Sequence, residues 1–151
     1  MPQSLSKICL HIVFSTKMRH PYFQDASIRE SAHHYLGGTC NNLGCPIVRV
    51  GGVADHVHIL CLLGRTICVA DLVKELKRDS SKWAKTQSSE LADFYWQNGY
   101  ATFSVNPGHV ETLREYIDKQ EEHHQTVSFQ DEYRGLLKDH GLQWEERYVW
   151  D

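Results

Sequence analysis

Two histidines separated by one apolar residue stand in a β-rich run that reads Asp55-His56-Val57-His58. In a strand, residues i and i+2 face the same way, so His56 and His58 should project side by side with Val57 in the opposite layer. Two neighbouring imidazoles suit a divalent metal ion. An isolated pair of this kind also fits two surface histidines on a half-exposed strand. Asp55, which precedes the pair, either begins the strand or orients one of the imidazoles.

A tyrosine and a glutamine share one face of a helix expected over residues 107–125. Tyr116 and Gln120 are four residues apart and are therefore neighbours on the helix surface, with His123 near the same face. A phenol oxygen can attack phosphorus and form a covalent phosphotyrosine. A metal ion can withdraw charge from the phosphate. Taken alone, Tyr116 and Gln120 also fit the boundary of an ordinary amphipathic helix.

Basic residues recur at helical spacing over residues 69–87, and two more follow the first expected strand. Such a stripe can track a phosphate backbone, and a tryptophan beside it can stack on unpaired bases. The acidic residues interspersed with it fit a solvated helix face equally well. The candidate DNA-binding residues are Lys17, Arg19, Lys74, Lys77, Arg78, Lys82, Trp83 and Lys85.

The composition favours one globular protein and does not exclude nucleic acid as a partner. The chain has 151 residues, of which 41% are hydrophobic, enough to bury a core. No run approaches the ~18 consecutive apolar residues of a membrane span. The net charge is −3, but residues 1–85 carry eleven Lys and Arg against six Asp and Glu, which is compatible with one phosphate-binding face. Five cysteines without a CxxC pair suggest free thiols in a reducing cytoplasm.

The expected elements follow the order strand, helix, strand, strand, helix, strand, helix. This is the split βαβ, ferredoxin-like order: an α+β fold with an antiparallel sheet, helices on one face, a C-terminal tyrosine helix and a short extension. We expect residues 1–126 to form the main domain and residues 127–151 to pack on it as the extension. The predicted elements span residues 5–15, 25–43, 47–53, 56–63, 69–87, 100–105, 107–125 and 131–140.

Together these motifs resemble the single-tyrosine HUH transposases of the insertion-sequence-200-like group, in which HUH denotes His-hydrophobic-His. His56-Val57-His58 matches the histidine motif, and Tyr116 with Gln120 matches the tyrosine helix. The resemblance extends over nearly the whole chain, because flanking stretches also look like the family. These stretches are HIVFSTKMRHPYF, GGVADHVHIL, LKRDSSKW and WQNGYATFSVN.

The resemblance implies a metal-dependent enzyme that cleaves and rejoins single-stranded DNA at hairpin-bearing element ends. Tyr116 would be the nucleophile and would keep the 5′ phosphate. A divalent ion, Mg²⁺ or Mn²⁺, would be held by His56, His58 and Gln120, with His123 as the alternative third ligand. No nucleotide cofactor is expected, since a phosphotyrosine conserves the energy of the phosphodiester.

The resemblance also implies a cytoplasmic homodimer, associated with the bacterial nucleoid when bound to DNA and independent of membranes. In such a dimer the tyrosine helix of one subunit completes the histidine pair of the other. The segment after the tyrosine helix also fits the branch associated with short palindromic chromosomal repeats. Three alternatives stay open: a domesticated repeat-associated transposase, an inactive module that binds single-stranded hairpins, and a hydrolase that uses water while Tyr116 is structural.

Overall fold

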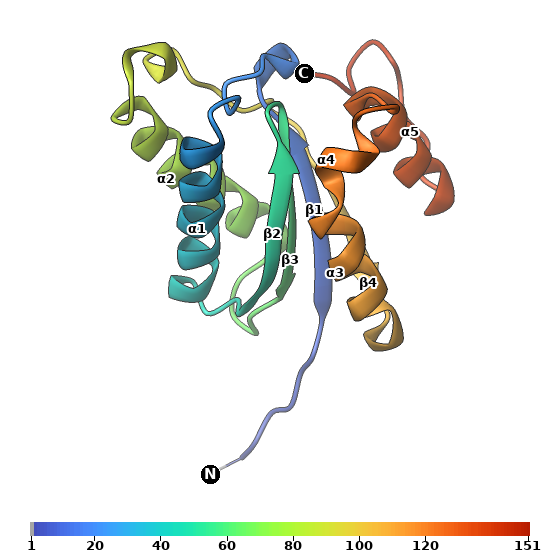
Figure 1. Cartoon of the computed structure of the whole chain (residues 1–151). Helices are drawn as coiled ribbons and strands as arrows, with labels where there is room; N and C mark the ends of the chain where they lie inside the picture. Colours follow the sequence, from blue (N-terminus) through green and yellow to red (C-terminus); the bar gives the residue numbers. More distant parts are fainter. Residues whose placement is uncertain (1) are drawn as a thin grey trace.

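Four strands form one antiparallel sheet in the order β2-β3-β1-β4 (Figure 1). The computed structural model describes residues 2–151. Helix α1 joins β1 to β2 and helix α2 joins β3 to β4, which gives the ferredoxin-like connection and confirms the predicted α+β fold. The elements are β1 (Cys9–Ser15), α1 (Ala26–Asn42), β2 (Ile47–Val53), β3 (His56–Leu62), α2 (Val69–Lys85) and β4 (Ala101–Val105).

The central strand β1 is buried on both faces, and its alternation assigns each face a separate layer. Leu10, Ile12 and Phe14 join the core beneath α1 and α2. Val13 points to the other face, where it packs with residues of β4 and of α5 (Phe129–Asp139). The first strand begins at Cys9, later than predicted, because its ladders with β3 and β4 both start there.

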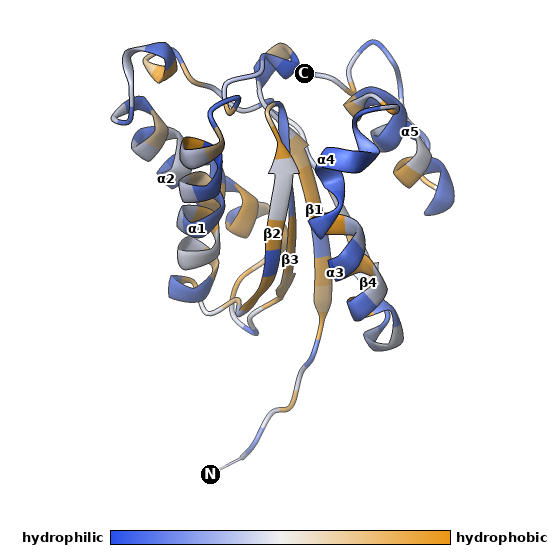
Figure 2. Ribbon diagram, in the orientation of Figure 1, coloured by the Kyte–Doolittle hydropathy of each residue, from blue (hydrophilic) through white to orange (hydrophobic). Residues whose placement is uncertain are grey.

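Helices cover both faces of the sheet (Figure 1). The prediction of helices on one face holds for α1 and α2, which share one apolar core. The tyrosine helix and the extension lie over the opposite face. Figure 2 shows that α4 (Gln120–His123) is hydrophilic although it lies against the sheet. Because α4 is polar and yet packs on the sheet, polar contacts rather than apolar burial hold it there.

The helix predicted over residues 107–125 is divided into three parts. A 3-10 turn (Pro107–His109) precedes α3 (Val110–Asp118), and α4 follows. At Lys119 the backbone leaves the helical region, with φ −99° and ψ 18°, and its amide is shared between the carbonyls of Glu115 and Tyr116. A shared amide of this kind is common at helix ends. The break therefore separates Tyr116, on α3, from Gln120, on α4.

Two general expectations can be compared with the described residues. None of the helices within residues 2–151 combines the length and apolarity needed to cross a bilayer. All five cysteines are free, and only Cys68 is exposed. The Asp25 side chain accepts hydrogen bonds from the amides of Ser27 and Ile28 at 2.9 and 3.1 Å, so α1 begins close to residue 25, where the predicted helix starts.

Gly51 allows α3 to lie directly against β2. A Cβ atom at this position would lie 2.6 Å from Cγ2 and 2.9 Å from the carbonyl oxygen of Ile117, the residue that follows Tyr116. We expect Gly51→Ala to push α3 outward, to cost about 1–3 kcal/mol of unfolding free energy as overpacking does, and to reduce any activity of Tyr116. Urea unfolding measures the first effect.

The control for this substitution is Gly38→Ala. Gly38 is exposed on α1, and an added Cβ there meets nothing within 4 Å. Because alanine favours a helix over glycine, this variant should be up to about 1 kcal/mol more stable. Equal stability of Gly51→Ala and the parent protein would show that α3 accommodates the methyl group without strain.

Candidate active site

The paired histidines lie on β3, on the face that α3, α4 and α5 cover. His56 and His58 are fully buried, and their ring centroids are 5.1 Å apart. Val57 points to the opposite face and joins the core under α1 and α2. The period of two in the strand thus places both imidazoles in one interior position. Their burial does not fit the alternative of two surface histidines on a half-exposed strand.

The tyrosine and glutamine motif meets this pair within the same chain. The Tyr116 ring lies edge-on to the His58 ring, with centroids 5.8 Å apart. Gln120, which is 1% exposed, places Oε1 3.0 Å from Nε2 of His56. The break at Lys119 ends α3 after Tyr116, and α4 brings Gln120 to His56. The structure therefore brings together four residues that the sequence motifs single out.

Glu132 lies at the centre of the cluster, although no sequence motif indicated it. This residue of α5 has its Oε1 3.1 Å from Nε2 of His58 and 3.3 Å from Nε2 of His56. Its Oε2 accepts hydrogen bonds from the hydroxyl of Tyr116 and, at 3.0 Å, from Nε2 of Gln120. The carboxylate therefore stands between the tyrosine hydroxyl and the paired imidazoles.

The structure places His124, and not His123, at the inner position. Nε2 of His124 lies 2.9 Å from Oε1 of Gln120 and 3.1 Å from Oε1 of Glu132. His123 sits at the edge, with Nε2 3.4 Å from Oε2 of Glu132 and without a hydrogen-bond partner among residues 2–151. The spacing of four between Tyr116, Gln120 and His124 was the available sequence signal for this third imidazole.

The charges of the cluster compensate each other. Burial alone would lower the pKa of His56, but hydrogen bonds to Asp55 and Glu132 outweigh it and raise that pKa to about 9. Burial would likewise raise the pKa of Glu132, yet hydrogen bonds from His124, His56 and His58 hold it well below its usual range. Glu132 is thus an anion among imidazoles at neutral pH.

Tyr116, His58 and His11 stay neutral in this arrangement. Burial, followed by the negative charge of Glu132 and the hydrogen bond to it, raises the pKa of Tyr116. Burial lowers the pKa of His58 and, more strongly, that of His11, whose Nε2 lies 2.8 Å from Nδ1 of His58. The phenol proton is therefore held at the tyrosine oxygen and directed at the carboxylate.

The donor atoms fit a divalent cation. The ligand atoms of His56, His58, His124 and Glu132 all lie within 4.8 Å of one another. Nδ1 of His56 is 2.7 Å from Oδ1 of Asp55, so that its Nε2 is left to face the cluster. Imidazole ligands of metals commonly have their second nitrogen bound in this way. These residues could therefore hold a divalent metal ion.

Comparison with known proteins identifies the family. The model of the family described as transposase IS200-like matches residues 4–120. The chain belongs to this transposase family. His56, His58, Tyr116 and Gln120 lie within the matched range, whereas His124 and Glu132 follow it. No curated protein sequence matches the chain.

Solved structures of two transposases share the fold of this IS200-like chain. A provisionally assigned transposase from Deinococcus radiodurans R1 is 21% identical, with a TM-score of 0.62 over 80% of this chain and 95% of its own. A REP-associated tyrosine transposase bound to a REP hairpin is 12% identical, with a TM-score of 0.60 over 84% of this chain and 74% of its own. At these identities the likeness concerns the fold.

The basic residues predicted to bind DNA in this transposase are distributed over two regions. Lys17 and Arg19 follow β1, where the amide of Thr16 donates to the carbonyl of Asp55, next to His56. The others lie on α2 and are separated from the histidines by the sheet. These α2 residues are Lys74, Lys77, Arg78, Lys82, Trp83 and Lys85.

Several of these side chains have partners within the protein. The ammonium group of Lys77 donates to the carbonyls of Gln97, Asn98 and Gly99 at 2.7, 3.1 and 2.6 Å, and burial lowers its pKa to about 8. Trp83 stacks on Tyr35 of α1, with ring centroids 5.4 Å apart. Arg78 forms ion pairs with Glu75 and Asp79. Lys85 donates a hydrogen bond to Ser81. The side chains of Lys74 and Lys82 are exposed.

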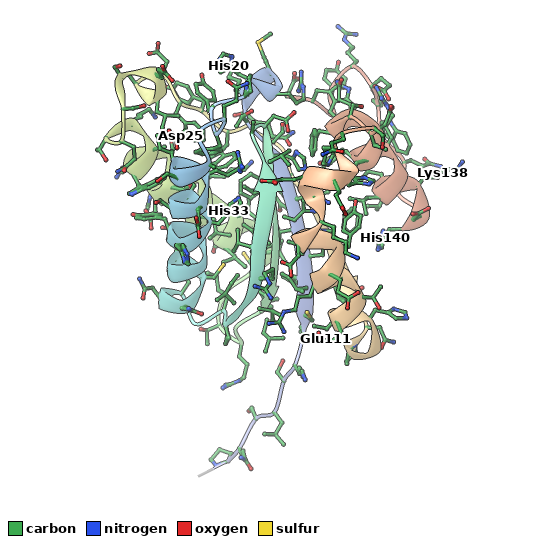
Figure 3. All side chains as sticks on the ribbon, viewed as in Figure 1. His20, Asp25, His33, Glu111, Lys138 and His140 are labelled. Carbon is green, nitrogen blue, oxygen red and sulfur yellow. The ribbon has the colours of Figure 1, made fainter. Side chains whose placement is uncertain are left out.

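A cavity of about 320 Å³ borders Tyr116 between β4, α3 and α5. Phe103 and His140 form one wall, where their rings stack with centroids 4.1 Å apart. His140, at the end of α5, lies beside α3 (Figure 3). His11, whose Nε2 contacts Nδ1 of His58, also lines this cavity. The cavity leaves one side of the tyrosine open to a ligand.

Proposed function

We propose that this transposase cleaves and rejoins single-stranded DNA through a 5′-phosphotyrosine on Tyr116, at sites next to imperfect hairpins. The observation that carries the proposal is the convergence of Tyr116, His56, His58 and Gln120 on one buried position. The family match supplies the reaction class, because a transposase must break and join DNA strands. The REP hairpin bound to the second solved structure supports the choice of hairpin DNA as the probe.

Cleavage in this proposal exchanges one phosphate ester for another. The Tyr116 oxygen forms a bond to the scissile phosphorus, the bond from phosphorus to the 3′ oxygen breaks, and the phenol proton is finally carried by the leaving 3′ hydroxyl. Attack by a 3′ hydroxyl on the phosphotyrosine reverses these changes and restores the phenol. No external energy source is required, since the number of phosphate ester bonds is unchanged.

The residues of the chain orient and neutralise the reacting groups. A divalent cation, Mg²⁺ or Mn²⁺, at His56, His58 and Gln120 would supply Lewis-acid stabilisation of charge on the phosphate. The hydrogen bond from Tyr116 to Glu132 directs the phenol at the centre of the cluster. Lys17 and Arg19, beside the strand end that bears His56, are the predicted phosphate contacts nearest to it.

Capture of the covalent intermediate tests this function. Purified protein, Mn²⁺ and a panel of labelled single-stranded hairpins with flanking sequence would be incubated and separated on a denaturing gel. We expect a protein–DNA adduct with at least one hairpin and none after chelation of the metal. Hairpin binding without an adduct across the whole panel would contradict the enzyme and support a binding module.

Assembly of the site within one chain leads to a further prediction. Tyr116 lies against His58, and Gln120 against His56, within one chain, in contrast to the homodimer with sites completed in trans that the family resemblance implies. We expect no recovery of activity when His56→Ala and Tyr116→Phe chains with different tags are co-expressed and mixed pairs are purified. Adduct formation by purified mixed pairs would show that the tyrosine acts in trans.

A further inference from the structure

We propose that the segment after the family-matched region supplies two more ligands, Glu132 and His124, and thereby completes a cation site of three imidazoles and one carboxylate. The catalytic use of that cation rests on the proposed function, whereas its binding does not. Both residues lie beyond residue 120, where the family match ends. The inference extends the ligand set of His56, His58 and Gln120 that the family resemblance implies.

The two oxygens of the Glu132 carboxylate have different partners, which suits this residue to the role of a ligand. Oε1 faces the imidazoles and lies 3.1, 3.3 and 3.1 Å from Nε2 of His58, His56 and His124. Oε2 faces the other way and accepts from Tyr116 and Gln120. One oxygen is thus directed at the metal-binding nitrogens and the other at the nucleophile, so a cation at Oε1 would lie near the phenol.

The hydrogen bond of His124 fixes which nitrogen faces the cluster. Nδ1 of His124 lies 2.6 Å from the carbonyl oxygen of Val127, which can only accept, so Nδ1 carries a proton. Nε2, which points at Glu132 and donates to it here, is therefore the nitrogen that would lose its proton and coordinate a cation. His56 is held in the same manner by Asp55. Strand β3 and the residue that follows α4 thus direct two Nε2 atoms at one place, where a cation would displace their protons.

The burial of Glu132 requires a positive partner. Its side chain is 2% exposed, and a buried carboxylate is costly unless it is paired or coordinates a metal. Glu132 lies in the first turn of α5, which Ser128 caps by accepting a hydrogen bond from the amide of Asp131. Phe129 packs against His56 with ring centroids 4.6 Å apart. A divalent cation at this position would take the place of the imidazole protons that otherwise balance the charge of Glu132.

The donor set also predicts which cation is preferred. Mg²⁺ favours oxygen ligands and retains several waters, whereas imidazole nitrogen suits first-row transition metals. With three imidazoles, the site should bind Mn²⁺ more tightly than Mg²⁺. The contribution of His124 matters for this preference, because a site with two imidazoles, a carboxylate and an amide would contain only as many nitrogen as oxygen ligands.

Calorimetric titration of the DNA-free protein with Mn²⁺ tests the ligand set. We expect Glu132→Gln and His124→Gln each to weaken Mn²⁺ binding by at least about 10–100-fold, the loss typical of even outer partners of a metal site. Glu145→Gln, an exposed change in the same extension, is the matched control and should bind as the parent protein does. Thermal unfolding of the metal-free variants checks that they remain folded.

A second measurement needs no substitution. Pulsed electron paramagnetic resonance of the Mn²⁺-loaded protein counts coordinated histidine nitrogens, of which we expect three. Two nitrogens would remove His124 from the site, and unaltered Mn²⁺ affinity in Glu132→Gln would remove the carboxylate. A Glu132→Gln variant that forms more adduct than the parent would also overturn the proposal, since the carboxylate would then compete with the DNA phosphate.

These outcomes separate the ligand set from the proposed function. Weakened Mn²⁺ binding in both variants, with no adduct from the parent protein on any hairpin, would uphold the cation site and reject the strand-transfer reaction. An adduct from the parent protein, with Mn²⁺ affinity and adduct yield unchanged in both variants, would uphold the reaction and reject these two ligands.

Discussion

Tyr116→Phe is expected to abolish the covalent protein–DNA adduct while hairpin binding remains close to that of the parent protein. Phenylalanine keeps the ring that packs with the apolar cluster of β3 and α3, and it removes only the hydroxyl that donates to Glu132. Without that oxygen no phosphate ester can form. Since a hydrogen bond to a charged group contributes about 1.5–3 kcal/mol, we expect a moderate loss of stability that leaves the protein folded.

Tyr148→Phe provides the control for the tyrosine substitution. Tyr148 is 57% exposed in the C-terminal segment, and the same loss of a hydroxyl there should leave the adduct yield unchanged. The assay is a denaturing gel with labelled hairpins, read beside a binding assay under native conditions. Cleavage retained by Tyr116→Phe would favour the hydrolase that uses water as its nucleophile and would make Tyr116 structural.

His56→Gln should produce the second large effect, a loss of both metal binding and metal-dependent cleavage. Nε2 of His56 is directed at Gln120 and Glu132, and the hydrogen bond between its Nδ1 and Asp55 holds the ring in this orientation. Replacement of a direct ligand should reduce Mn²⁺ affinity and adduct yield by more than the 10–100-fold typical of outer partners. Hairpin binding should change less, because most contacts to nucleic acid are made to phosphate and sugar.

His34→Gln is the matched control for this change. His34 is exposed on α1, on the far side of the sheet from the cluster. Both substitutions remove one imidazole, but only that at His56 leaves a buried carboxylate with fewer partners. Thermal unfolding therefore has to accompany the assay, as a fall in stability is expected at His56 alone. Full cleavage by folded His56→Gln protein would contradict a metal site at this position.

The strands and their faces could be predicted because the pattern that determines them is local. Alternation around His56 and His58 assigned both imidazoles to one layer and Val57 to the opposite layer, and the structure has the same assignment. The predicted start of the helix at residue 25 likewise coincides with the N-cap that the Asp25 side chain provides. Such features depend on neighbours within a few residues, and so the sequence carries them directly.

Contacts between distant elements were not predictable in the same way. Glu132 reaches His58 across 74 residues of chain and a turn between α4 and α5, and no periodicity in the sequence indicates that approach. The break at Lys119 was also missed, since no proline or glycine marks it in the sequence, and α3 and α4 on its two sides both pack on β2. Lys77 was assigned to a stripe on α2, but its carbonyl partners belong to a loop twenty residues later.

The alternation of β3 has a consequence for insertions and deletions in this strand. His56 and His58 face the cluster, while Val57 and Ile59 face the apolar core. An insertion or deletion that shifts the register of β3 by one residue would exchange the two sets, burying imidazoles under α1 and α2 and placing aliphatic groups against Tyr116. A two-residue shift would return each side chain to its original face of the sheet and would change only the length of the strand. Among length variants of this strand, those differing by an even number of residues are the ones that can retain both a folded core and a metal site.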